Sequence, residues 1–187
     1  MVLNDAEIRP SLIEFLLAKS VKPRKIIEEL HVHRGNAIAD VVAIHSEAHC
    51  YEIKGDNDKV ERANKQGEYF NKTFSKVSLV TTRKNLNKAI KLVPPFWGVI
   101  VAFEFDGVIK FKYYRKAGIN PFFDKSLALA TLWRSELDAL GDELKIDMPK
   151  KVNKREFASE LSYRMSKSQI TKSIANTLAQ RVKNHEA

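Results

Sequence analysis

The chain has 187 residues, of which 44% are hydrophobic and 29% charged, a composition ordinary for one soluble globular domain. No apolar run approaches the ~20 residues that span a bilayer, and the first residues lack a signal-peptide pattern, so we expect a cytoplasmic protein with no membrane partner. The single cysteine, Cys50, excludes an intrachain disulfide. The net charge of +9 suits a polyanion, most often nucleic acid.

Residue patterns along the first two thirds of the chain predict alternating helices and strands. Apolar residues at helical spacing follow Pro10, and shorter apolar runs are separated by turn residues such as Gly35-Asn36 and Asp106-Gly107. The predicted helices are 10–17, 58–73 and 85–92, and the predicted strands are 25–32, 37–44, 48–54, 77–82, 97–105 and 108–113. A strand meander that leads into a β-α-β unit predicts an α/β fold with one mixed sheet and helices on both faces.

Only helices are predicted after Gly118, at 125–140, 153–165 and 168–182. Residues 150–187 hold nine Lys or Arg and three Glu, a net charge of +6. We therefore divide the chain into a core at 1–142 and a basic helical extension at 143–187. The last two helices could form a helix-turn-helix that reads DNA, but a helical cover that packs on the core is favoured.

Three charged residues stand inside the predicted strands, where a sheet core would be apolar. Side chains alternate faces along a strand, so pairing of strands 37–44 and 48–54 would bring Asp40, Glu52 and Lys54 to one place. Burial of two carboxylates costs several kcal/mol per ion unless a cation compensates for it. Mg²⁺ or Mn²⁺ would do so, since hard divalent cations bind carboxylate oxygens and leave room for phosphate.

Asp40 followed by Glu52-Ile53-Lys54 resembles the D…(D/E)-x-K signature of the PD-(D/E)XK nuclease superfamily. Flanking residues add to the resemblance to a bacterial and phage branch of that superfamily, which extends over roughly residues 10–180: Gly35, Ala39, Tyr51, Gly55, Gln66, Trp97 and Trp133. The resemblance implies a restriction-endonuclease-like mixed central sheet flanked by helices. It also implies a metal-dependent nuclease, a phosphodiesterase in which a metal-activated water attacks the phosphate in line.

The resemblance also assigns roles to single residues. Asp40 and Glu52 would hold Mg²⁺ or Mn²⁺, and Lys54 would orient the water or stabilise the transition state. An upstream glutamate often joins such sites, and here Glu29 is favoured over Glu28. Gln66 matches a glutamine in the helix that follows the signature.

The expected partner is nucleic acid, with DNA favoured over RNA, and cleavage of both strands of a duplex would favour a homodimer. Basic residues of the second helix and of the extension are the expected phosphate contacts: Arg62, Lys65, Lys150, Lys151, Lys154, Arg155, Lys167 and Lys172. Two alternatives stay open. One is a catalytically inactive DNA-binding module on the same fold, and the other is a phage or bacterial protein-interaction factor.

Overall fold

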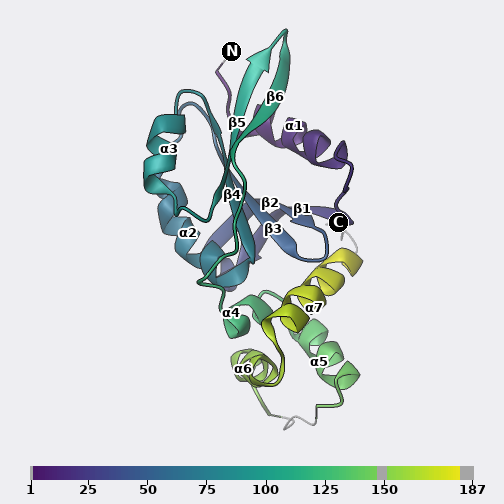
Figure 1. Ribbon diagram of the computed structural model, residues 1–187. Helices are drawn as coiled ribbons and strands as arrows, with labels where there is room; N and C mark the ends of the chain where they lie inside the picture. Colours follow the sequence, from purple (N-terminus) through teal and green to yellow (C-terminus); the bar gives the residue numbers. More distant parts are fainter. Residues whose placement is uncertain (1, 147–150, 182–187) are drawn as a thin grey trace, which may run out of the picture.

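The computed structural model describes residues 2–146 and 151–181 and contains a six-stranded mixed sheet whose spatial order follows the chain, β1 to β6 (Figure 1). The central strand β4 pairs in parallel with β3 and β5, and the other neighbours are antiparallel. The strands are β1 Lys25–Val32, β2 Ala37–Ile44, β3 Ala48–Lys54, β4 Lys76–Thr82, β5 Gly98–Phe105 and β6 Val108–Arg115. The predicted strands and the mixed α/β class are confirmed.

Helices cover both faces of this sheet. The seven α-helices of the described residues are α1 Asp5–Leu17, α2 Glu61–Thr73, α3 Leu86–Leu92, α4 Lys125–Leu129, α5 Arg134–Glu143, α6 Lys154–Arg164 and α7 Lys167–Gln180. Helix α1 lies on one side of the sheet and α2 and α3 on the other, while α4 to α7 gather at the end away from the β5–β6 hairpin (Figure 1).

Alternation along the strands supplies two separate apolar clusters, one on each face. On the α1 face, Ile8 and Leu12 pack with strand residues such as Tyr51 and Ile53. The opposite cluster is larger and joins the sheet to α2 and to the C-terminal helices. Phe157 of α6 and Leu178 of α7 belong to the same cluster as Val42 and Cys50. The division at residue 142 falls inside α5 and stays a prediction.

Several helix boundaries differ from the predicted ones; α2, for example, begins at Glu61 and not at Asp58. Helix α1 begins at Asp5, before Pro10, because the Asn4 side chain caps the helix and Glu7 completes a capping box. The predicted helix 125–140 is two helices, because α4 ends at Leu129 and α5 begins only at Arg134. The backbone N–H of Trp133 donates to the Glu136 carboxylate. Trp133 is 51% exposed, and the Arg181 guanidinium lies 4.3 Å from the centroid of its ring.

Gly67 stands in the middle of α2 because a tryptophan ring occupies the space beside it. A Cβ at this position would lie 2.8 Å from Cζ2 of Trp97, which is fully buried. The indole N–H of Trp97 donates to Asn71, also on α2, at 2.7 Å. The missing side chain therefore lets α2 approach the start of β5.

Candidate functional site

Asp40 lies where strands β2 and β3 separate. Their pairing runs from Ile44↔Ala48 to Val41↔Tyr51 and ends there. One residue further, Oδ2 of Asp40 accepts the backbone N–H of Ile53 at 2.7 Å. A carboxylate thus replaces the strand carbonyl that would otherwise accept this bond, and it is fixed beside Glu52.

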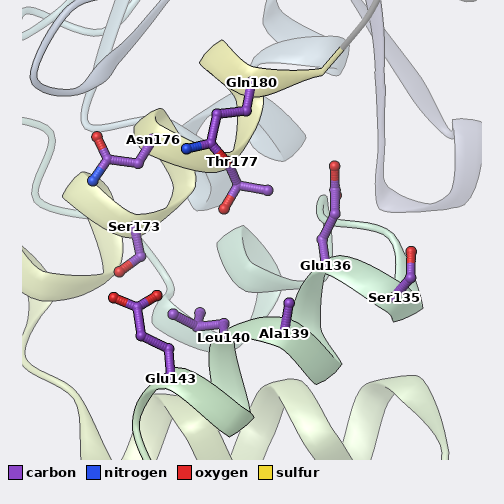
Figure 2. Close-up of a pocket in the computed structure, with 9 residues that line it drawn as sticks. All are labelled: Ser135, Glu136, Ala139, Leu140, Glu143, Ser173, Asn176, Thr177 and Gln180. Atoms are coloured by element: carbon purple, nitrogen blue, oxygen red, sulfur yellow. The ribbon is translucent and has the colours of Figure 1, made fainter.

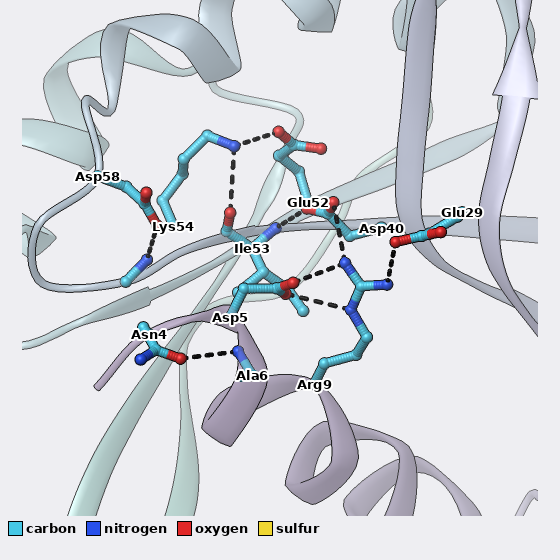
Figure 3. A network of polar contacts seen from close by, with 11 residues as sticks. Asn4, Asp5, Ala6, Arg9, Glu29, Asp40, Glu52, Ile53, Lys54 and Asp58 are labelled. Atoms are coloured by element: carbon cyan, nitrogen blue, oxygen red, sulfur yellow. Dashed lines mark hydrogen bonds and ion pairs between the residues drawn. The ribbon is translucent and has the colours of Figure 1, made fainter. Parts of the chain in front are cut away.

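Glu52 and Lys54 form a buried polar pair on β3. The Glu52 residue is 1% exposed, and its Oε1 atom contacts the Lys54 ammonium. The ammonium also donates to the carbonyl oxygen of Ile53 at 3.1 Å (Figure 3). The second carboxylate oxygen of Glu52 is buried and has no hydrogen-bond partner among the described residues. A buried oxygen without a partner costs free energy, so this pair is only partly compensated.

Burial and repulsion change the protonation of both acids. Burial, and then the neighbouring Asp40 carboxylate, raise the pKa of Glu52 to about 8, against the opposing effect of Lys54. Burial also raises the pKa of Asp40, against the opposing effect of the Ile53 N–H. Near neutral pH the two acids therefore carry less than two negative charges, because the fold keeps a proton on Glu52.

A second cation, Arg9 of α1, reaches Asp40 from the other side (Figure 3). Its guanidinium contacts Asp5 at 2.7 Å, Glu29 at 3.1 Å and Oδ1 of Asp40 at 3.6 Å. The Arg9 side chain is only 14% exposed, so these contacts are partly shielded from water. Sequence reasoning missed Arg9 because it placed the helix start after this residue.

Glu29, the expected third metal ligand, reaches the cluster only through Arg9. The register of β1 and β2 is unchanged from Glu28↔Val41 to Leu30↔Ala39, so Glu29 stands opposite Asp40, and its φ is 53°. Its side chain is 67% exposed and accepts a hydrogen bond from the Arg9 guanidinium. It is not directed toward Glu52 (Figure 3). Glu28 is exposed as well.

The structure thus brings Asp40, Glu52 and Lys54 together, as predicted, but adds a guanidinium beside the carboxylates. Within residues 2–146 and 151–181, no three His, Cys, Asp or Glu side chains come together as a metal-ligand set. Gln66 is half-buried on α2 and makes no polar contact with these acids in that part of the chain. Binding of Mg²⁺ or Mn²⁺ by Asp40 and Glu52 alone stays a prediction.

The predicted phosphate contacts lie on α2 and on or near α6 and α7. Arg62 and Lys65 are exposed on α2, and Lys151, Arg155 and Lys172 are exposed near or on the C-terminal helices, whereas Lys150 lies outside the described residues. Lys167 donates to the carbonyl of Asn120 at 3.1 Å and lies over the Phe123 ring. Lys154 and Arg155 line a hollow of about 230 Å³ together with His33, Arg34 and Asn36.

A second hollow, of about 390 Å³, lies between α5 and α7 (Figure 2). Its polar groups include the carboxylates of Glu136 and Glu143, and Figure 2 shows Glu143 directed toward Ser173 of α7. Carboxylates repel a polyanion, so this hollow does not fit nucleic acid. It contains none of the residues that the sequence suggested as a site.

No helix in the described parts of the chain has the length and apolar character required to cross a bilayer.

Comparison with known proteins gives a family. Residues 2–187 match the family model described as Bacteriophage P4 protein cII. A relative is Protein cII of Enterobacteria phage P4, which is 27% identical over 179 residues, 94% of this chain and 68% of that protein. No solved structure matches the chain significantly.

These matches contradict the assignment to the PD-(D/E)XK nucleases and, with it, the metal-dependent phosphodiesterase activity. The site roles given to Asp40, Glu52, Lys54, Glu29 and Gln66 stay predictions. The physical reason for the error lies in the cluster itself. Converging carboxylates require compensation, but the protein's own cations, Lys54 and Arg9, provide it. Convergence alone therefore did not establish catalysis.

Proposed function

Since the chain belongs to the bacteriophage P4 protein cII family, we propose that it is a non-catalytic regulatory protein that binds duplex DNA. A protein that binds DNA without cutting it acts by occupying a site or by excluding other proteins from it. The net charge of +9 supports a polyanionic partner.

The observation that carries this proposal is the hollow between the turn after β1 and the start of α6. Three cations line it, Arg34, Lys154 and Arg155, and no carboxylate does. Arg34 has a positive φ of 61°, within a short 3-10 turn at His33–Gly35. Cations from two segments far apart in the sequence thus meet at one concave place.

The charges in this hollow disfavour one another. The pKa of Lys154 is lowered first by burial and then by the neighbouring guanidinium groups of Arg181 and Arg34, with Glu136 opposing. A bound phosphate would relieve this repulsion and release counterions from the DNA. The flanking Lys151 is exposed and extends the positive surface.

The test is fluorescence anisotropy with a labelled 20-base-pair duplex over a series of salt concentrations. We expect binding that weakens steeply with salt, and a triple Ala variant of Arg34, Lys154 and Arg155 whose log–log salt slope is smaller by about 2–3, since each lost phosphate contact removes ~0.9. A matched variant replaces three exposed lysines elsewhere, Lys22, Lys59 and Lys91, and should change the slope less.

Equal losses in the two triple variants would refute the hollow as the contact surface. Absence of duplex binding by the wild-type protein at low salt would refute DNA binding and favour a protein-interaction factor. The same preparation can be tested for a homodimer by analytical ultracentrifugation. A homodimer, a cytoplasmic location and the restriction-endonuclease-like form of the sheet stay predictions.

A further inference from the structure

One face of the β5–β6 hairpin carries exposed aromatic rings. Phe105 is 60% exposed and Tyr114 is 55% exposed. This hairpin lies at the end of the molecule opposite α6 (Figure 1). The hollow on the hairpin shares no lining residue with the basic hollow at Arg34, Lys154 and Arg155.

The strand register arranges these side chains in two rows. Phe103 pairs with Lys110, Val101 with Lys112, and Phe105 with Val108. Residues two apart share a face, so an apolar row on β5 runs beside a row on β6 that contains two lysines. Glu104 pairs with Ile109 and, by the same alternation, belongs to the other face.

A hollow of about 510 Å³ lies on this face. Its lining includes Phe103, Lys112 and Tyr114 of the hairpin, together with Arg83 and Leu86 from the segment around the start of α3. The Arg83 guanidinium lies 4.3 Å from the centroid of the Phe103 ring. The pairing of β5 and β6 shifts register here and skips Tyr114, which directs this bulged residue out of the regular ladder.

No carboxylate lines the hollow, whereas Arg83 and Lys112 do, so charge complementarity points to an anion with apolar parts. An acidic peptide would satisfy the cations, but it offers planar groups to the rings only where it carries aromatic residues. In a duplex the base faces are stacked on one another, so they are not free to stack on the aromatic rings of the protein. Single-stranded DNA offers both a negative backbone and exposed base faces.

We propose that this hairpin face binds single-stranded DNA, with bases stacked on Phe103 and Tyr114 and phosphates along Lys110, Lys112 and Arg83. Each stacked base contributes through its π-face, so the surface would accept many sequences. Arg83, already over Phe103, adds a cation–π contact to the stack. This site does not depend on duplex binding at the basic hollow.

The test measures the affinity of a labelled oligothymidylate of 12 nucleotides by fluorescence anisotropy. Phe103→Leu keeps an apolar side chain but removes the ring, and Tyr114→Ala removes the bulged ring. We expect either change to weaken binding about five-fold or more, and Phe103→Tyr to keep most of the affinity. Tyr163→Ala is the matched aromatic control, since Tyr163 is 88% exposed on α6. Circular dichroism melting confirms that each variant is folded.

Two results would overturn the proposal. One is an unchanged affinity for the oligonucleotide in Phe103→Leu and Tyr114→Ala. The other is a loss of single-strand binding in the Arg34, Lys154 and Arg155 variant that matches its loss of duplex binding, which would place both kinds of DNA on the basic hollow. If the hairpin variants lose affinity for single-stranded DNA only, the result supports the site, whether or not the protein also binds duplex DNA.

Discussion

The Oδ2 atom of Asp40 lies 2.7 Å from the backbone nitrogen of Ile53, so a side chain completes the hydrogen bonding of the sheet where β2 leaves β3. Asp40→Ala removes this acceptor and leaves the N–H of a residue that is 2% exposed without a partner. Asp40→Asn keeps an acceptor oxygen and equally removes the charge beside Glu52. We expect the Ala variant to be less stable than the Asn variant by about 1–3 kcal/mol in urea unfolding. Equal stabilities would show that the bond contributes little.

Arg9 should stabilise the fold by neutralising Asp40. Arg9→Met keeps the apolar stem but removes the guanidinium, and we expect a loss of about 1–3 kcal/mol in the free energy of unfolding, measured by urea denaturation. Glu29→Gln is the control, because Glu29 is 67% exposed and should cost less than about 0.5 kcal/mol. A larger loss in Glu29→Gln than in Arg9→Met would contradict this assignment.

Any divalent cation at Asp40 and Glu52 has to compete with the Arg9 guanidinium, which lies 3.6 Å from Oδ1 of Asp40. We therefore expect Arg9→Ala to bind Mn²⁺ more tightly than the wild-type protein in isothermal titration calorimetry. Adding Asp40→Asn to Arg9→Ala should abolish the gain. Identical heats for the wild-type protein and Arg9→Ala would remove the support for a metal at this place.

Glu52 should make stability depend on pH. Its pKa rises from 4.5 to about 8 on folding, so between these values the folded state holds a proton that the unfolded state has released. The contribution of Glu52 to the free energy of unfolding therefore falls as pH rises through this range, by a few kcal/mol at most, on the order set by 1.36 kcal/mol per pKa unit. Unfolding of wild-type protein and Glu52→Gln at several pH values isolates this contribution. A pH-independent difference between them would contradict the raised pKa.

Gly67→Ala should destabilise the protein, although Ala favours a helix over Gly by ~1 kcal/mol. The new methyl group would lie 2.8 Å from the buried Trp97 ring, which its hydrogen bond to Asn71 holds in place. We expect a net loss of about 1–3 kcal/mol, seen as a lower Tm. Asn64→Ala, at an exposed position of the same helix, should leave the Tm unchanged or raise it.

The strands could be predicted because their signals are local. Alternating apolar residues and turn residues such as Asp106-Gly107 are readable within a few positions of each strand. The start of α1 was also readable, since Asn4 and Glu7 have the spacing of a capping box. Because the predicted helix begins only at Pro10, it does not contain Arg9, and Arg9 was not considered as a cation beside Asp40.

The meaning of the acidic cluster could not be read in the same way. The convergence of Asp40, Glu52 and Lys54 follows from strand alternation, but the compensating cation comes from Arg9, 31 residues before Asp40 in the sequence. Such a contact depends on how α1 packs on the sheet, which no local pattern specifies. The exposed ring of Trp133 has a similar origin, since its place depends on the distant Arg181.

The apolar cluster that joins Val42 and Cys50 to Phe157 and Leu178 has a practical consequence. A shortened protein ending near residue 142 would expose the apolar face of the sheet, and exposed apolar surfaces promote aggregation during expression. The last two helices are therefore part of the folded core, and removing them is expected to make the protein less stable and less soluble.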